Sequence, residues 1–263
     1  MTRSKNLLLG SLPPAGLRPW RMAAVCALLL LASQPAQAQS SKVPWQNLTQ
    51  AQLTAVWWQW FLGIPVSQNP AFDETGAKAL NGQPYSDLVF LCGTFALNPD
   101  PNDPNGGLLG VANRSITLKQ GTALFFPLIN FEQDNVALRP GRLGAGFGVP
   151  GGNLSIPQMQ AITGNAANSA TALVATLAQA PTVVSLPHAR LQAPVFAYKM
   201  PKTDNIYQYF GVDVSGAIAP AVADGHWAFV PPGTLQPGAY VLKFGGHVPG
   251  FTQDIEYHLT VTP

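Results

Sequence analysis

The most regular alternation of apolar and polar residues lies at residues 255–262, where Ile255, Tyr257 and Leu259 alternate with Glu256 and His258. A period of two predicts a strand with one buried face and one solvated face. Residues 239–244 alternate in the same way, so we expect the two segments to pair as an antiparallel hairpin. Shorter apolar runs between turn residues predict further strands at residues 88–95, 115–119, 123–129, 182–186, 194–200 and 227–230.

One segment has the features of a helix rather than a strand. Thr49 and Gln52 have the spacing of a capping box, and residues 51–62 follow with few polar interruptions before Gly63. The run is apolar on more than one face, since it contains three tryptophans and a phenylalanine. A helix that is apolar all round is expected to be buried. The alternative is an aromatic platform for a membrane or a ligand.

A second helical region is predicted at residues 155–180, because Ser155 can cap it and the segment is rich in alanine. Gly164 and Asn165 are expected to divide it into two pieces. The whole chain contains 25 Gly and 25 Pro, which suits many short strands joined by turns. We therefore predict a mainly β fold, an antiparallel β-sandwich of the jelly-roll or immunoglobulin-like kind. It is expected to form a single domain over residues 39–263, with the Trp-rich helix at its start and a helical insertion near residues 155–180.

The first 38 residues differ in composition from the rest. Four basic residues and no acidic one precede an apolar run at residues 22–32, and the small-x-small sequence Ala36-Gln37-Ala38 follows. This order predicts a secretory signal peptide cleaved near Ala38. The apolar run is shorter than the roughly 20 residues that span a bilayer, so a membrane anchor is the weaker alternative. We expect a secreted or periplasmic protein whose mature chain does not span a membrane.

Removal of that segment changes both the charge and the cysteine count. The sequence has 14 Lys and Arg against 12 Asp and Glu; without the four basic residues, 10 remain against 12, a formal charge of −2. A weakly acidic chain argues against nucleic acid as a partner. Cys26 lies in the removed segment and leaves Cys92 alone, so no internal disulfide is expected. Cys92 lies in an apolar run, which favours a buried, inert thiol over a nucleophile.

Short motifs in a fixed order run through nearly all of residues 39–263. They are Trp57-Trp58-Gln59-Trp60, Asn69-Pro70, Asp73 with Thr75-Gly76, Gly82-Gln83, Val89-Phe90-Leu91 with Gly93-Thr94-Phe95, Ala123-Leu124-Phe125-Phe126-Pro127, Ala223-Asp224-Gly225 and Phe244-Gly245-Gly246. In this set and order the chain resembles a largely uncharacterised family of exported bacterial proteins rich in β-structure. The resemblance implies a secreted β domain and supplies no catalytic residues.

The chain departs from that family at two places. Its relatives carry one cysteine after the Thr-Gly motif and another before the Phe-Phe-Pro strand. Here those stretches are Lys78-Ala79-Leu80 and Arg114-Ser115-Ile116. The resemblance therefore implies that a disulfide of the relatives is missing, and we expect packing or a bound cation to supply the stability instead.

Oxygen-rich side chains cluster at residues 98–107, a loop that contains Asp100, Asp103 and three asparagines. Carboxylate and carbonyl oxygens are the ligands that calcium prefers, so Asp100 and Asp103 are candidate calcium ligands. The spacing differs from that of an EF-hand loop, and the prolines equally suit a plain solvated turn. Calcium is the cofactor that the sequence indicates.

Two other groups are candidates for catalysis. Asn130, Glu132 and Asp134 directly follow the apolar strand at residues 123–129 at a spacing of two, so on an extended chain their side chains, including both carboxylates, point the same way. Such a pair can bind a cation or act as general acid and base, and a polar loop leaving the strand is the plain alternative. Asp224 and His226 form the second group, although Asp-Gly is also a common turn sequence. The sequence contains no serine nucleophile elbow, paired-histidine zinc motif, phosphate loop or dinucleotide fingerprint.

These features favour a secreted hydrolase that acts on a small ester or lactone. Glu132 or Asp134 would activate water, Asp224 and His226 are further catalytic candidates, and calcium would assist. A small-molecule substrate is preferred because the sequence shows no repeated aromatic array that would line a groove for a long polymer. The alternative is a non-catalytic secreted binding or surface module that recognises an extracellular glycan or a protein.

Overall fold

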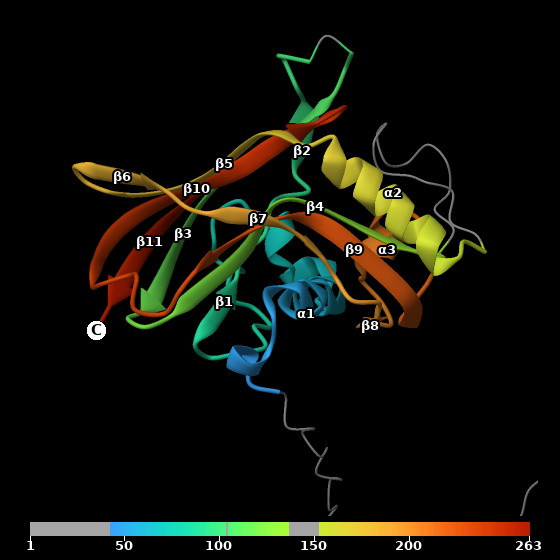
Figure 1. Cartoon of the computed structure of the whole chain (residues 1–263), viewed down its shortest axis with the longest axis horizontal. Helices are drawn as coiled ribbons and strands as arrows, with labels where there is room; N and C mark the ends of the chain where they lie inside the picture. The colour runs from blue at the N-terminus through green and yellow to red at the C-terminus, as the bar shows by residue number, and fades with distance from the viewer. Residues whose placement is uncertain (1–42, 104, 137–152) are drawn as a thin grey trace, which may run out of the picture. The chain divides into compact units, whose positions relative to one another are not determined.

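A computed structural model describes residues 43–103, 105–136 and 153–263, and the predicted signal peptide at residues 1–38 lies outside them. The described chain consists of two β-sheets and a small number of helices (Figure 1). The helices are α1 (Gln50–Gly63), α2 (Ile156–Asn168) and α3 (Ile206–Tyr209), with short 3₁₀ turns at Trp45–Asn47, Val66–Gln68 and Pro70–Phe72. None of the described helices is long and apolar enough to cross a membrane. The mainly β fold predicted from the sequence is confirmed.

Sheet A contains five strands, which are β1 (Leu88–Phe90), β4 (Ala123–Asp134), β7 (His188–Gln192), β8 (Phe196–Met200) and β9 (Gly216–Val230). β4 lies between β1 and β9, and β7 and β8 pair with the other side of β9. β1 runs parallel to β4, and the other neighbours are antiparallel. Because β7 and β8 follow one another along the same side of β9, together they form one edge of the sheet.

Sheet B contains six strands, which are β2 (Leu97–Pro99), β3 (Leu108–Lys119), β5 (Thr171–Gln179), β6 (Thr182–Ser185), β10 (Gly238–Val248) and β11 (Phe251–Thr262). Their order across the sheet is β2-β3-β11-β10-β5-β6. β3 and β11 are parallel, and the other neighbours are antiparallel. The predicted antiparallel hairpin is confirmed as β10 and β11, whose strands are longer than expected because only Pro249 and Gly250 connect them.

The two sheets pack face to face around one apolar cluster. Phe126 of β4 and Phe244 of β10 have ring centroids 4.6 Å apart. Leu124 and Leu128 of sheet A and Leu242 of sheet B are fully buried in the same cluster. This arrangement is a β-sandwich, as the sequence predicts, but each sheet includes one parallel pair.

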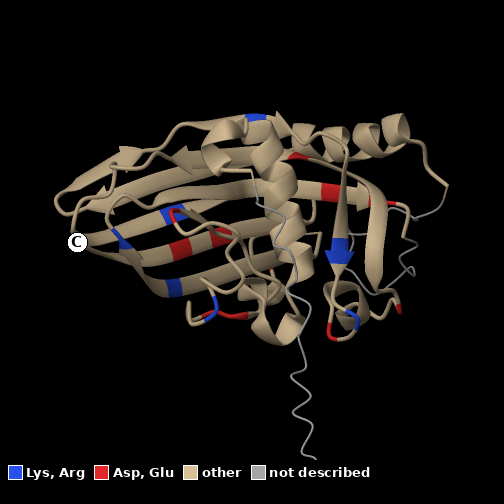
Figure 2. Cartoon of the chain, turned by 90° about the horizontal axis from the view of Figure 1, so that it is seen from below, with Lys and Arg blue, Asp and Glu red and all other residues tan. Residues whose placement is uncertain are grey.

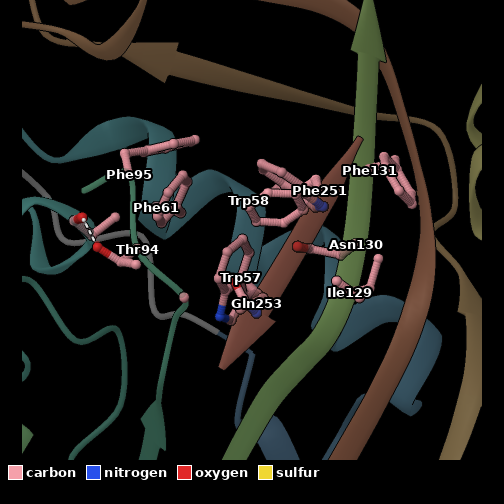
Figure 3. Close-up of a pocket in the computed structure, with 12 residues that line it drawn as sticks. Trp57, Trp58, Phe61, Thr94, Phe95, Ile129, Asn130, Phe131, Phe251 and Gln253 are labelled. Carbon is pink, nitrogen blue, oxygen red and sulfur yellow. Dashed lines mark hydrogen bonds between the residues drawn. The ribbon is translucent and has the colours of Figure 1, made fainter. Parts of the chain in front are cut away.

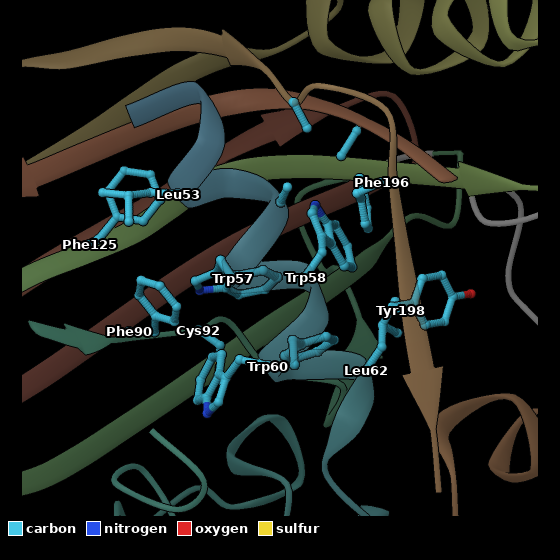
Figure 4. Packing of buried hydrophobic residues seen from close by; sticks show 14 of the residues in the cluster. Leu53, Trp57, Trp58, Trp60, Leu62, Phe90, Cys92, Phe125, Phe196 and Tyr198 are labelled. Carbon is cyan, nitrogen blue, oxygen red and sulfur yellow. The ribbon is translucent and has the colours of Figure 1, made fainter. Parts of the chain in front are cut away.

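Helix α1 covers the opposite face of sheet A (Figure 4). It begins with the predicted capping box: the Gln52 N–H donates to the Thr49 hydroxyl at 3.2 Å, and the Thr49 N–H donates to the Gln52 side chain at 2.9 Å. The Trp57 ring stacks on Phe61 at 4.7 Å and meets the edge of Trp227 of β9 at 5.4 Å. The prediction that this helix is buried is therefore confirmed.

Residues 155–180 differ from the prediction of a helix in two pieces. α2 continues through Gly164 and ends at Asn168, whereas residues 171–179 form β5. The backbone of β5 pairs with β10 on one side and β6 on the other, and its Ala175 and Leu177 are buried in the sandwich. Alanine favours a helix locally, but ladder hydrogen bonds on both sides and core burial outweigh that preference.

A β-bulge in β4 changes which residues of this strand face α1. The pairing of β4 with β9 shifts register between Pro127 and Ile129. Before the shift, Phe125 belongs to the cluster under α1 and Phe126 to the cluster between the sheets. One extra residue reverses this parity, so even-numbered residues face α1 after the bulge.

The bulge therefore places polar residues in the layer beneath α1. Strand β4 does not end at residue 129 as predicted but continues to Asp134. Glu132 pairs with Ala223 and Asp134 with Ala221, and both alanines belong to the cluster under α1. The side chains of Glu132 and Asp134 consequently point to the α1 side of sheet A.

Candidate functional site

The carboxylate of Asp134 lies among three hydrogen-bond donors. The Tyr207 hydroxyl donates to Oδ2 at 2.7 Å, the Tyr198 hydroxyl donates to the same oxygen, and the Val136 N–H donates to Oδ1 at 2.6 Å. Only 2% of Asp134 is exposed. Burial and the two neighbouring carboxyl groups raise the pKa of both tyrosines, so their hydroxyls remain donors. These three donors hold the Asp134 carboxylate in one orientation.

Glu132 shares this face of β4 but has the opposite environment. Its Oε1 atom is buried and has no hydrogen-bond partner within the described part of the chain. Burial raises the pKa of Glu132 well above its ordinary value, and the negative charge of Asp134 raises it further. The pair therefore combines a buried carboxyl group whose pKa is raised with a neighbouring carboxyl group held by three hydrogen bonds, and paired carboxyl groups in different environments are common in acid and base catalysis.

A pocket of about 70 Å³ lies where α1 meets the beginning of β11 (Figure 3), and its lining extends along β4 to Phe131, the residue before Glu132, without including either carboxyl residue. Asn130, two residues before Glu132 on β4, points into it. Half of the lining residues are aromatic, and the others are small or aliphatic residues and two amides. The lining consists of Trp57, Trp58, Phe61, Ala71, Gly93, Thr94, Phe95, Ile129, Asn130, Phe131, Phe251 and Gln253. No lining side chain carries a charge, so the pocket suits an uncharged ligand.

Most polar groups around the pocket are hydrogen-bonded. The Trp57 indole donates to the Leu91 carbonyl at 2.8 Å. The Thr94 hydroxyl donates to the Ala71 carbonyl at 3.2 Å, and the Gln253 amide donates to the Leu128 carbonyl at 2.9 Å. The bond from Gln253 satisfies the residue that the β4 bulge leaves unpaired.

Two donors of the pocket differ from these. Trp58 Nε1 and Asn130 Nδ2 are buried, and neither finds a hydrogen-bond acceptor among the described residues. Trp58 is 9% exposed. A buried donor without an acceptor costs roughly 1–3 kcal/mol, so two in one pocket are a feature that requires an explanation.

Asp224 and His226 lie on the other face of sheet A from Glu132 and Asp134, so the structure does not bring the two groups of catalytic candidates together. In β9 the residues that face α1 are the odd-numbered ones, such as Ala223, and the side chains of Asp224 and His226 face α2 instead. Asp224 is 3% exposed and is paired with Arg190, whose Nε and Nη2 donate to its two oxygens at 3.0 and 2.8 Å. The Asp-Gly sequence is part of a strand rather than a turn.

These residues attach α2 to the sheet. Arg190 also donates to the Gly164 carbonyl of α2 at 3.0 Å and to the Asn168 side chain. His226 Nε2 lies 3.1 Å from the Ala167 carbonyl, near the C-terminal end of α2. Asp224, Arg190 and His226 thus form a set of hydrogen bonds that connects sheet A to α2.

The candidate calcium ligands Asp100 and Asp103 are engaged in local hydrogen bonds. Asp100 accepts from the Asn102 N–H at 2.9 Å and from the Thr252 hydroxyl at 2.8 Å, and these bonds lower its pKa. Asp103 accepts from the Asn105 N–H at 2.8 Å. Within residues 43–103, 105–136 and 153–263, no three His, Cys, Asp or Glu side chains are grouped to hold a metal ion. A calcium ion held by Asp100 and Asp103 stays a prediction from the sequence.

Cys92 is buried, as predicted, and burial raises the pKa of its thiol to about 11. Its carbonyl accepts from the fully buried Arg114 at 2.7 Å, and the same guanidinium donates to the Asp73 carbonyl at 2.7 Å and to the Tyr257 hydroxyl at 2.7 Å. The two stretches at which the family resemblance implies cysteines are neighbours, since the Ser115 N–H donates to the Thr75 carbonyl at 2.9 Å. Hydrogen bonds from Arg114 thus connect this region without a disulfide.

Several site residues were not identified from the sequence. Tyr198 lies in a segment predicted as a strand and Tyr207 in an unassigned one, and neither carries a motif. Trp58 was expected only as a core aromatic. Asn130, by contrast, was grouped from the sequence with Glu132 and Asp134 by their shared period of two, although without a role of its own.

No family model, curated protein or solved structure matches the chain. The class of protein therefore follows from its own geometry: a β-sandwich with a Trp-rich helix on one outer face and, beneath this helix, a buried acidic pair beside an uncharged aromatic pocket. Lys and Arg positions are scattered among Asp and Glu positions along the described chain in the view of Figure 2.

Proposed function

We propose that the protein is a hydrolase that cleaves a small, uncharged ester or lactone, with Glu132 as its general acid and base. The observation that carries this proposal is the buried, unpartnered Oε1 of Glu132 next to a fully hydrogen-bonded Asp134. Burial and the charge of Asp134 raise the pKa of Glu132 well above its ordinary value, so its carboxylate is a stronger base than an exposed glutamate. Nothing in the fold of a buried strand requires such a group.

The reaction uses one water molecule and needs no covalent intermediate. Ionised Glu132 removes a proton from the water as its oxygen attacks the ester carbon. Glu132 then gives this proton to the leaving alkoxide as the carbon–oxygen bond of the ester breaks. The products are an acid and an alcohol, or a single hydroxy acid from a lactone, and Glu132 returns to its starting form.

Asp134 acts through Glu132 rather than on the substrate. Its charge is fixed by Tyr198, Tyr207 and the Val136 N–H, so it remains close to Glu132 throughout the reaction. A fixed negative charge makes Glu132 a stronger base. Asp134 and the two tyrosines are therefore positioning residues.

Calcium does not enter this mechanism, because the described oxygens of Asp100 and Asp103 already accept hydrogen bonds within their loop. A cation at residues 98–107 stays a prediction from the sequence. Activity measured with added calcium and with a chelator tests it, and we expect the two rates to agree.

The experiment is an activity screen of the purified protein on p-nitrophenyl acetate, followed by absorbance, and on δ-valerolactone, followed by acid release. We expect turnover of at least one compound. Glu132→Gln keeps the shape of the side chain and removes the base, so kcat should fall about 100-fold or more.

The matched control is Asp224→Asn, which changes a buried carboxylate of the same sheet on the face that holds α2. Its kcat for the folded protein should equal that of the wild type. Undiminished kcat in Glu132→Gln, or a folded wild type that cleaves neither compound, would overturn the proposal.

The pocket supports a second candidate, a secreted module that binds an extracellular glycan. Its aromatic rings together with the Asn130 and Gln253 amides form the kind of surface on which sugars stack and hydrogen-bond. Binding on a glycan array, together with no turnover of either ester probe, would favour this function over hydrolysis.

A further inference from the structure

The two buried donors without acceptors lie in the same pocket. Trp58 Nε1 comes from α1, and Asn130 Nδ2 comes from β4, the strand that continues to Glu132. Figure 3 shows both side chains on the wall where α1 faces β4, with Gln253 beneath them. The pocket is therefore not simply apolar: it offers two N–H groups at one end.

Three other tryptophans of this region have acceptors for their indole N–H groups, whereas Trp227, outside the pocket lining, does not have one among the described residues. Trp57, one residue earlier in α1, donates to the Leu91 carbonyl at 2.8 Å, and Trp60 donates to the Asn81 carbonyl at 3.0 Å. Trp45 donates to the Asp87 carboxylate at 2.9 Å. The fold thus supplies a hydrogen-bond acceptor for each of these three tryptophans.

The chemistry of the missing partner follows from what the pocket lacks. Its polar atoms comprise two N–H groups in need of an acceptor, whereas the Thr94 and Gln253 groups are already bonded. The ligand must therefore present an oxygen with two free lone pairs. An anion is disfavoured, because no lining side chain is charged and Glu132 nearby adds negative charge when it ionises.

The volume limits how much of the ligand enters. A cavity of ~150 Å³ holds a benzene molecule, whereas this pocket measures about 70 Å³. A few non-hydrogen atoms fit, such as a carbonyl group with its adjoining carbon and oxygen. The rest of the molecule must lie outside, toward the aromatic side chains at the rim.

We propose that this pocket binds the carbonyl end of a small uncharged ester or lactone, and that Trp58 Nε1 and Asn130 Nδ2 both donate to its carbonyl oxygen. This inference rests on the proposed function for the position of Glu132, but the binding itself does not depend on hydrolysis. Asn130 and Glu132 lie on the same face of β4, and the Cα atoms of residues two apart on a strand are separated by about 7 Å. As negative charge develops on this oxygen during attack by water, both donors strengthen their bonds to it.

The experiment follows the tryptophan indole N–H resonances by ¹H–¹⁵N NMR during titration with δ-valerolactam, an uncharged cyclic carbonyl compound that resists hydrolysis. Tetrahydropyran, a ring of the same size without a carbonyl group, is the control. We expect a saturable shift of the Trp58 resonance with the lactam and none with tetrahydropyran. The Trp227 resonance should not move, since its unpaired indole lies outside the pocket lining.

Two variants form a matched pair. Trp58→Phe and Trp227→Phe each remove one buried indole N–H that has no acceptor among the described residues. Lactam affinity should fall about tenfold or more in Trp58→Phe and in Asn130→Leu, and should be unchanged in Trp227→Phe. Thermal unfolding confirms that each variant is folded.

The inference is overturned if the Trp58 resonance does not move, if tetrahydropyran shifts it equally, or if folded Trp58→Phe binds the lactam as the wild type does. Lactam binding without turnover of any ester would contradict the proposed hydrolase function but support this carbonyl-binding site. If wild-type turnover is lost in Glu132→Gln but the lactam does not shift the Trp58 resonance, the proposed hydrolase function is supported and this carbonyl-binding site is contradicted.

Discussion

The two faces of sheet A differ in whether their polar side chains have hydrogen-bond partners: Asp224 and Arg190 are paired on one face, whereas Glu132 and Asn130 have unpaired atoms on the other. On the face that holds α2, Asp224, Arg190 and His226 are connected to one another or to carbonyls of the helix. On the face that holds α1, Glu132 and Asn130 carry buried atoms that have no partner within the described residues. The same pair of strands, β4 and β9, supplies both sets.

This difference in hydrogen-bond pairing distinguishes polar residues that stabilise the fold from those that we propose to act on a ligand. The hydrogen bonds of the paired groups offset the cost of burying them and attach α2 to the sheet. The fold therefore accounts for these groups. Unpaired groups reduce the stability of the fold, and several of them beside one pocket are best explained by a ligand that completes their bonds. The following predictions test this division.

The largest effect on stability is expected when the paired face is broken. Asp224→Ala leaves Arg190 without its carboxylate and weakens the attachment of α2. Arg190 is 38% exposed and can turn toward water, so the free energy of unfolding should fall by roughly 1–3 kcal/mol rather than by the full cost of an unpaired buried charge. Denaturant unfolding measures this change. A loss of turnover in the folded protein would contradict the division between the faces.

Removing the charge of Asp134 should shift the pH dependence of hydrolysis. The negative charge of Asp134 contributes to the raised pKa of Glu132. In Asp134→Asn this contribution disappears, so the pKa of Glu132 falls. Since hydrolysis requires ionised Glu132, the rising limb of kcat/KM should move to lower pH. A pH–rate profile that stays in place, or moves upward, would exclude Glu132 as the base.

The smallest effect is expected at His226. Its ring lies 3.1 Å from the Ala167 carbonyl, and this contact is a single hydrogen bond at the end of α2. His226→Ala should lower the free energy of unfolding by about 1 kcal/mol and leave kcat unchanged. Thermal unfolding together with an ester assay checks both parts. A decrease in kcat of the folded variant would return His226 to the catalytic candidates.

The features that local sequence determines were predictable. The β10–β11 hairpin follows from alternation, and α1 follows from the capping box at Thr49 and from Gly63. Strand β5 was not predictable, because its alanines favour a helix locally and only its pairing with β10 and β6 makes it a strand. Most of β9 was also missed, since Ala221 and Ala223 show no strand pattern and are small because α1 packs over them.

The site was predictable only in part. The spacing of Glu132 and Asp134 indicated one shared face, and this is confirmed by the pairing of both residues with buried alanines of β9. Their separation from Asp224 and His226 was not predictable, because it depends on a bulge that a sequence pattern does not reveal. Tyr198 and Tyr207 are brought to Asp134 by β8 and α3, and such long-range contacts leave no local signal.

The most direct measurement compares the thermal stability and the turnover of Glu132→Gln with those of the wild type at about pH 8 and about pH 4. The pKa of Glu132 in the folded protein lies above its value in the unfolded chain, so the folded state holds the proton more tightly. Stability should therefore fall as pH rises from near 4.5, the ordinary value, through the folded pKa. Glutamine does not ionise and avoids this loss.

We predict that Glu132→Gln is more stable than the wild type at about pH 8, that this difference shrinks toward about pH 4, and that turnover is lost. Such a result would show a residue that is retained for chemistry against the stability of the fold. A variant that is no more stable than the wild type at the higher pH, or one that keeps its turnover, would contradict the account.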